Sequence, residues 1–351
     1  MKYVPFIMLT CVFVIFNRSM NADENGFSYS GYAEIYYRGI IPKIANKEIE
    51  SFVYNHKVQG SIRSNLLLLQ GSYNDENYKG NIGLMAGDYA TYNLRSEPSW
   101  AQYIYEATMG IALDKKQNIW LQVGIMPSHI GFENAKGKDC WTLTRSIQAD
   151  NSPYYESGLA LHYSNNDNSL DVRFLVVNGW QQIAVKNHGI VPAIGLQIQY
   201  RPNSNILLNY SNYIGNCKIN NVGSFRTYHN VYAISNVHKN VDLITGLDLG
   251  TEKIAGESTR IWYSPIILLR YKAADKIHVA ARTEFMVDKS QVIIQSNDNN
   301  SIITGYSLNV DYTLLENVLL RCEGKYLLSD TLLFNNASSQ TSITFSGSYH
   351  L

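Results

Sequence analysis

Apolar and polar residues alternate along most of this chain with a period of two. In the segment 305–314 every second residue is Tyr, Leu or Val, and Ser, Asn, Asp and Thr stand between them. The final segment, 341–351, follows the same rule. Such alternation places apolar side chains on one face of a β-strand and polar side chains on the other. Its repetition without helical periodicity predicts an all-β protein.

The alternating runs predict about 16 strands. The predicted ranges are 27–37, 60–73, 77–90, 100–113, 118–126, 154–164, 168–178, 191–201, 205–214, 225–237, 240–251, 260–272, 275–288, 302–314, 317–329 and 341–351. Most of them are longer than the roughly five or six residues typical of soluble sheets. They match the roughly 9–11 residues that a tilted strand needs to cross a bilayer.

The predicted connections alternate between short and long. The short ones include Asp75-Glu76 and Ala273-Ala274, whereas the stretch 127–153 is the longest. Outer-membrane barrels have this layout, with tight turns on the periplasmic side and long loops outside. We therefore expect a closed antiparallel transmembrane β-barrel with both termini on the periplasmic side.

Composition agrees with a barrel and excludes other classes. Lys and Arg total 29, as do Asp and Glu, so the chain lacks the basic footprint of a nucleic-acid binder. Beyond the first twenty residues, no window approaches the roughly 18 apolar residues of a spanning helix. The mean hydropathy of −0.18 resembles that of a soluble protein. A hydropathy average does not detect strands that are apolar only at every second position. The composition is therefore compatible with a membrane β-barrel.

The N-terminus has the layout of a secretory signal peptide. Lys2 precedes the largely apolar segment Val4–Phe16, and small or polar residues follow up to Ala22. This layout predicts a cleaved signal over 1–22 and a single barrel domain over 23–351. The alternative is an uncleaved N-terminal anchor.

Three cysteines remain after cleavage of this segment, namely Cys140, Cys217 and Cys322. An odd number does not make a disulfide framework. Cys140 and Cys217 could pair if their loops meet. The simpler interpretation is three unpaired thiols.

Tyrosine is unusually abundant, with 26 Tyr against 11 Phe and 5 Trp. Many tyrosines lie near predicted strand ends, as at Tyr37, Tyr73, Tyr103, Tyr163, Tyr200, Tyr263 and Tyr349. This placement predicts aromatic girdles at the two membrane interfaces. Cross-strand pairing also favours Tyr and is the alternative explanation.

Four short stretches carry a family resemblance. They read GIMPSHIGFEN from Gly124 to Asn134, TRS from Thr144 to Ser146, DNSPYYESG from Asp150 to Gly158, and NGWQ from Asn178 to Gln181. Together they resemble the OmpL-like family of outer-membrane β-barrel porins. The resemblance covers about a fifth of the chain, and it implies a Gram-negative outer-membrane barrel. It supplies neither a substrate nor an established set of functional residues.

The longest connection is the expected constriction. A barrel of about 16 strands is too wide for side chains to fill and leaves an aqueous channel. In general porins with 16 strands the third outer loop commonly folds into that channel, and by this resemblance 127–153 does so here. Acidic and basic side chains that face each other across a narrow channel impose a field on passing solutes. The candidate residues are Glu106, His129, Glu133, Asp139, Arg145, Asp150, Glu156, Arg173, Arg201, Arg270, Arg282, Glu284, Asp311, Arg321, Glu323 and Lys325.

Motifs for catalysis or cofactor binding are absent from the sequence. It contains no GxSxG, HExxH, GxGxxG or CxxC motif, and its histidines lack metal-type spacing. We therefore expect no enzyme, no cofactor and no metal. His129 beside Ser128, or His162, could serve a barrel-embedded lipase, but nothing places a base against a nucleophile.

The predicted function is passive diffusion of small hydrophilic solutes or ions through an outer-membrane porin. The expected partners are membrane lipid and those solutes, with no nucleic acid. Assembly into a homotrimer is an alternative to a monomer. The near-balanced lumen charge predicts weak ion selectivity. Alternatives are a non-conducting adhesin or surface scaffold, a hydrolase, and a transporter of a hydrophobic compound, which would need an apolar patch in the lumen.

Overall fold

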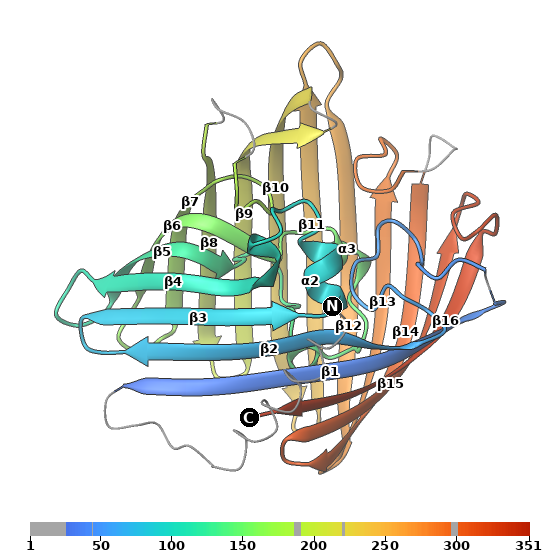
Figure 1. Ribbon diagram of the computed structural model, residues 1–351, viewed down its shortest axis with the longest axis horizontal. Coiled ribbons are helices and arrows are strands. Elements are labelled where there is room, and N and C mark those ends of the chain that lie inside the picture. The colour runs from blue at the N-terminus through green and yellow to red at the C-terminus, as the bar shows by residue number, and fades with distance from the viewer. Residues whose placement is uncertain (1–25, 44, 186–190, 220–221, 296–300) are drawn as a thin grey trace, which may run out of the picture.

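Sixteen antiparallel strands close into a single barrel in the computed structural model. The structure describes residues 26–43, 45–185, 191–219, 222–295 and 301–351. Each strand pairs with its neighbours in sequence, and β1 (Phe27–Ile41) pairs with β16 (Ser339–His350) to complete the ring. In Figure 1, β1 to β4 cross in front of the strands behind them, as the tilted strands of a barrel do. The predicted signal peptide, 1–22, lies outside the described residues.

The remaining strands follow one another around the barrel. They are β2 (Ile62–Asn74), β3 (Tyr78–Ala86), β4 (Ile104–Ala112), β5 (Ile119–Pro127), β6 (Tyr155–Ser164), β7 (Leu170–Val177), β8 (Ala193–Asn203), β9 (Ile206–Ile219), β10 (Val222–His238), β11 (Val241–Ile254), β12 (Arg260–Ala274), β13 (Ile277–Asp288), β14 (Ser301–Leu315) and β15 (Val318–Ser329). The helical elements are short: α2 (Asp88–Asn93), η1 (Ala101–Tyr103), η2 (Gly137–Asp139) and α3 (Ile147–Asp150). No helix within the described ranges is long and apolar enough to span a membrane.

The predicted all-β transmembrane barrel is confirmed, and all sixteen predicted strands are present. The prediction of a long loop at 215–224 is wrong. Its Asn and Gly residues favour a turn, but β9 and β10 continue to Ile219 and from Val222, with Cys217 opposite Ser224. Pairing along the whole hairpin overrides the local composition.

Two predicted strands include residues that are helical in the structure. The range 77–90 was predicted as one strand, but β3 ends at Ala86 and α2 begins at Asp88. The Asp88 carboxylate accepts hydrogen bonds from Tyr36 and Arg63 on the neighbouring strands, which fixes the start of this helix. Within the predicted strand 100–113, residues Ala101–Tyr103 form η1, and β4 begins at Ile104.

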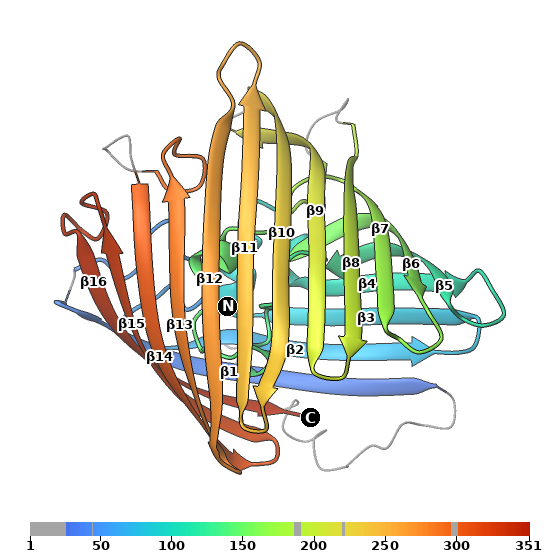
Figure 2. The same cartoon turned by 180° about the vertical axis from the view of Figure 1, so that it is seen from behind.

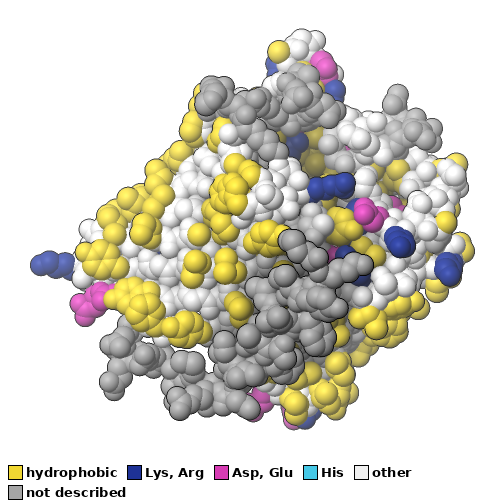
Figure 3. All heavy atoms as spheres, in the orientation of Figure 1, with side chains coloured by type: hydrophobic (Ala, Val, Ile, Leu, Met, Phe, Trp, Pro, Cys, Tyr) yellow, Lys and Arg dark blue, Asp and Glu magenta, His cyan; other side chains and the backbone are white. Residues whose placement is uncertain are grey.

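The outer face of the barrel is apolar. Large side chains that alternate along the strands, such as Ile267 and Leu269 on β12, are exposed on this face. Figure 3 shows hydrophobic side chains spread over the wall, with most of the visible charged side chains toward the ends of the molecule. Six of the predicted girdle tyrosines are exposed on this face, namely Tyr37, Tyr103, Tyr163, Tyr200, Tyr263 and Tyr349.

Short turns join the strands at one end of the barrel, at 75–77, 113–118, 165–169, 204–205, 239–240, 275–276 and 316–317. β1 begins and β16 ends at this same end. The opposite end carries the longer connections, and the hairpin of β11 and β12 projects furthest there (Figure 2). The alternation of short and long connections therefore holds except between β9 and β10.

Candidate pore constriction

The connection between β5 and β6, residues 128–154 and here called loop L3, lies inside the barrel. Every residue from Thr142 to Asp150 is buried. The loop is bonded to several parts of the wall: the Gly131 amide donates to Asn230 on β10 (3.2 Å), and the Leu143 amide donates to Asn309 on β14 (3.1 Å). Arg321 on β15 donates to the Gly137 carbonyl (2.6 Å). The loop thus crosses the lumen, as expected from the sequence.

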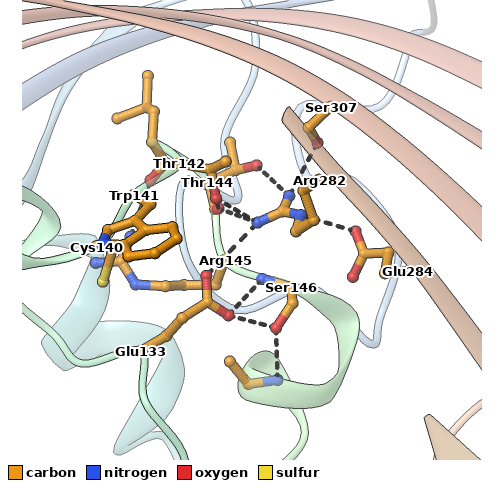
Figure 4. Close-up of polar contacts among 12 residues, drawn as sticks. Glu133, Cys140, Trp141, Thr142, Thr144, Arg145, Ser146, Arg282, Glu284 and Ser307 are labelled. Carbon is orange, nitrogen blue, oxygen red and sulfur yellow. Dashed lines mark hydrogen bonds and ion pairs between the residues drawn. The ribbon is translucent and has the colours of Figure 1, made fainter. Parts of the chain in front are cut away.

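Arg282 on β13 forms the centre of this attachment (Figure 4). Its Nη1 donates to Thr142 Oγ1 (2.6 Å) and to the Thr144 carbonyl (2.7 Å). Its Nη2 donates to Ser307 Oγ (3.0 Å) on β14. The guanidinium also forms ion pairs with three buried carboxylates, which lie 3.2–3.5 Å away and belong to Glu323, Glu284 and Glu133.

The wall carboxylates bind the backbone of the loop. Glu323 on β15 accepts hydrogen bonds from the Thr144 amide and, at 2.9 Å, from its hydroxyl. Glu284 on β13 accepts from the Ile147 amide at the start of α3 (2.6 Å). Lys325 completes the network, because its Nζ lies 2.9 Å from Glu284 and donates to the Arg145 carbonyl. Wall side chains therefore satisfy the polar backbone groups that a buried loop would otherwise leave unpaired.

Arg145 links separate parts of loop L3 to one another. Its guanidinium donates to the carbonyls of Asn134 (2.8 Å), Leu143 (2.8 Å) and Ala135 (3.1 Å). Glu133 accepts from the amide and hydroxyl of Ser146, the residue that caps α3. Burial raises the pKa of Glu133, and the charge of Arg282 opposes that shift. The loop is thus internally braced as well as attached to the wall.

His129 anchors the start of the loop. Its Nδ1 lies 2.8 Å from Glu156 Oε2, and its Nε2 lies 2.7 Å from the Asn212 carbonyl on β9. Both partners are acceptors, so both ring nitrogens donate and the ring is an imidazolium. Burial by itself would lower the pKa of His129, but the neighbouring Glu156 carboxylate outweighs burial, and the pKa is raised.

The raised pKa of His129 predicts a pH-dependent anchor. Its contribution to stability should be complete below the unfolded value of about 6.5 and be lost as pH rises through the higher folded value. We expect the difference in unfolding free energy between the native protein and His129→Gln to shrink as the pH rises above about 6.5. Urea titrations in detergent micelles measure this difference. A difference that is constant with pH would contradict the assignment, and His238→Gln provides an exposed histidine as a control.

The sequence-predicted candidates divide into two groups. Buried within the loop and its attachment are His129, Glu133, Arg145, Asp150, Glu156, Arg282, Glu284, Arg321, Glu323 and Lys325. Accessible to water, fully or in part, are Glu106, Asp139, Arg173, Arg201, Arg270 and Asp311. Of these, Arg173, Arg201, Arg270 and Asp311 stand on strands toward the end of the barrel that carries the short turns, and we call the space that they face the vestibule. Asp139 belongs to L3, and Glu106 lies near the long-loop end of β4.

Three further loops meet around L3 at the opposite end. In the loop 42–61, Asn55 donates to Asp150 of α3 (2.7 Å), and burial raises the pKa of Asp150. Before β4, Glu97 accepts from the Ile183 amide (3.0 Å) of the loop between β7 and β8. Sequence reasoning missed these contacts, because a glutamate in a polar loop gives no signal of burial.

Sequence reasoning also missed an apolar patch on the lumen wall. Ile244, Ile266 and Leu268 face inward and are buried against Phe132 and Trp141 of L3. The patch is covered by the loop that packs on it, so its apolar surface serves attachment. Trp141 also stacks on Arg270, whose Cζ lies 4.5 Å from the ring centroid.

The buried charges are not balanced. Buried acidic side chains outnumber buried Lys and Arg side chains in the described part of the chain. The acidic ones are Glu34, Asp88, Glu97, Glu133, Asp150, Glu156, Asp248, Glu252, Glu284, Asp288 and Glu323, and the basic ones are Arg38, Lys57, Arg145, Arg226, Arg282, Arg321 and Lys325. The whole chain has equal numbers of acidic and basic residues. Acidic side chains are therefore preferentially buried, and the rest of the chain carries more basic than acidic side chains.

The cysteines and metal-ligating side chains form no further site within the described residues. No disulfide joins Cys140, Cys217 and Cys322. Burial raises the pKa of Cys140, which keeps it a thiol. No group of three or more His, Cys, Asp or Glu side chains in the described ranges is arranged to hold a metal ion.

A family model matches residues 26–351 and therefore includes every strand of this barrel together with L3; its description is "Putative beta-barrel porin-2, OmpL-like". The chain belongs to this OmpL-like porin family. The expected family is thereby confirmed over the whole barrel rather than over the motif region alone. A search of curated proteins gave no match.

Solved structures with a similar fold are porins and outer-membrane proteins. The anion-selective porin from Comamonas acidovorans has a TM-score of 0.63 at 12% identity, with 93% of this chain and 99% of that chain covered. OmpT, an outer-membrane protein of Vibrio cholerae, has a TM-score of 0.62 at 10% identity, with 95% and 99% covered. A triple mutant of the Rhodopseudomonas blastica porin has a TM-score of 0.56 at 14% identity, with 93% and 100% covered. At these identities the likeness is one of fold, and with the family it supports the outer membrane as the location.

Proposed function

We propose that this OmpL-like barrel conducts small hydrophilic solutes or ions across the outer membrane by passive diffusion. The observation that carries the proposal is a barrel of 16 strands with a charged loop fixed across its lumen. A barrel this wide encloses more space than its wall side chains fill. Attachment of L3 to the wall then sets the size of the remaining passage, while the vestibule charges act on the solute.

The proposal includes an orientation and a maturation step. The short turns and both chain ends lie at the periplasmic side, and the long connections face outward. Residues 1–22 are removed as a signal peptide, which leaves 23–351 as the barrel domain. One solved form of Vibrio cholerae OmpT is a trimer. A homotrimer is a candidate assembly for this chain as well. The barrel is non-enzymatic and needs no cofactor.

A conductance measurement tests this function. Purified barrel, shown to be folded by its heat-modifiable mobility in gels, should give discrete conductance steps in planar bilayers. Liposomes that contain it should also swell in small sugars. A folded barrel that gives neither steps nor swelling would reject the channel.

The second candidate is a non-conducting barrel that acts as a surface scaffold. The extent of loop burial favours it, because Thr142 to Asp150 are all buried and Asn55 of the loop 42–61 bonds to α3. The same conductance and swelling measurements separate it from the channel.

A further inference from the structure

We propose that the vestibule selects for anions, with Lys79, Arg173 and Arg201 as the residues that determine this preference. The inference rests on the proposed channel function and deepens it. It replaces the weak selectivity expected from balanced lumen charge, because the structure separates the buried charges from the accessible ones.

The three cations stand on β3, β7 and β8; β7 and β8 are neighbours, and three strands separate β3 from β7. Lys79 on β3 follows the turn 75–77, Arg173 on β7 follows the turn 165–169, and Arg201 on β8 precedes the turn 204–205. The Arg173 side chain is 41% accessible, and Arg201 is exposed. Arg173 and Arg201 both lie within electrostatic range of the inward-facing Tyr232 hydroxyl, and Lys79 lies within electrostatic range of both Arg173 and Asp171. The three charges therefore share one side of the lumen (Figure 2 shows β7 and β8 side by side).

Lys79 and Arg173 share one nearby carboxylate among the described residues, that of Asp171. No carboxylate within the described residues forms an ion pair with Lys79 or Arg201, and the Lys79 ammonium lies over the Trp120 ring at 4.5 Å. The nearest carboxylate oxygen to Arg173 is that of Asp171, at 3.8 Å. Asp171 is itself held by His162 (2.6 Å) and Ser164 (2.7 Å). The positive charge on this side is thus poorly neutralised.

The acidic groups of the vestibule are already paired. Asp242 lies 2.7 Å from Arg270, Asp139 lies 3.0 Å from Lys138, and Asp311 lies 2.7 Å from Arg321. Of the other accessible acids, Glu106 has the Lys136 charge nearby, and Asp171 lies beside Arg173 and His162. Most other inward carboxylates are buried in the attachment of the loops. A solute that enters the vestibule therefore meets an excess of positive charge.

This excess acts on ions over a short range. One unit charge about 5 Å from an ion in a water-filled lumen changes the ion's occupancy by about fourfold. At 0.1 M salt the effect extends about 10 Å, which is sufficient inside a barrel. Charges that line a pore impose selectivity in this way.

The test is the anion-to-cation permeability ratio, taken from the reversal potential in a KCl gradient across a planar bilayer that contains the full-length mature barrel. We expect a ratio of about 3 or more for the native protein. Arg173→Gln with Arg201→Gln should bring the ratio close to one. Replacement of both arginines by Glu should invert the preference. Arg201→Gln alone, at an exposed position, should give an intermediate ratio if the double variants assemble poorly.

The matched control removes two cations outside the lumen. Lys115 and Lys116 are exposed in the turn 113–118 at the same end of the barrel, so Lys115→Gln with Lys116→Gln should leave the ratio unchanged. Conductance with a native ratio at or below one, or a ratio insensitive to the arginine variants, overturns this inference and leaves the channel standing. Absence of conductance in every folded variant removes both proposals.

Discussion

Arg282→Met should lower the free energy of unfolding by about 3–5 kcal/mol, because it leaves buried charges without their partner. The Arg282 side chain is fully buried, with three carboxylates within 3.5 Å. Its loss also removes the donors to Thr142 and the Thr144 carbonyl. Loop L3 should then detach from the wall, so we expect larger and noisier conductance steps together with the loss of stability. Urea titration and bilayer recording on the same preparation measure both effects.

An exposed ion pair on the same barrel supplies the control. Arg260 and Glu257 lie 2.6 Å apart at the long-loop end, with side chains 30% and 48% accessible. Surface pairs contribute about 0–1 kcal/mol, so Arg260→Met should change stability little and conductance not at all. An equal loss of stability in both variants, or a stable Arg282→Met barrel with native conductance, would show that Arg282 does not hold the loop.

Removal of 134–144, replaced by a short Gly-Ser linker, should raise the conductance or the solute size limit severalfold. This segment contains η2 and Trp141, and it makes the bonds to β14 and β15 that carry the loop across the lumen. Its removal opens space beside the apolar patch of Ile244, Ile266 and Leu268. Single-channel recording and liposome swelling with sugars of increasing size measure the change.

Shortening of another long-side connection is the comparison. Residues 255–259 join β11 to β12 and are all exposed. Replacement of this connection by a tight turn removes loop residues without touching the lumen, and the conductance should stay at the native value. If both deletions leave conductance unchanged, L3 does not set the passage.

The barrel was predictable because each strand must satisfy the same physical requirement. Lipid on one side and polar groups on the other impose strict alternation, and closure is needed to pair every backbone group in hydrocarbon. The segment 305–314 shows this pattern in the sequence and forms β14. The hairpin of β9 and β10 was less predictable, since Gly215, Asn216 and Gly223 are used in paired strands.

The site was predictable in its location but not in its packing. Sequence placed Arg282 and Glu323 on the inward face, where they are found, but a single sequence does not show which inward charges a loop will cover. One overlooked signal was present. Runs in which both strand faces are apolar, such as Leu66–Leu69 and Ile266–Leu269, mark walls whose inner side is also covered. Leu66 and Leu68 pack in the same cluster as Tyr89 of α2, and Ile266 and Leu268 pack against L3.

The attachment of L3 also fixes an order of events during assembly. The loop follows the fifth strand, but its main anchors, Arg282, Glu284, Glu323 and Lys325, stand on β13 and β15. Contacts between residues so distant in sequence form slowly, because a long stretch of chain must first be ordered. Until the last hairpins join the sheet, the polar backbone of L3 has no wall to bind. Seating of the loop and closure of β1 onto β16 are therefore late and mutually dependent steps, and a chain truncated before β13 would have a barrel neither closed nor obstructed.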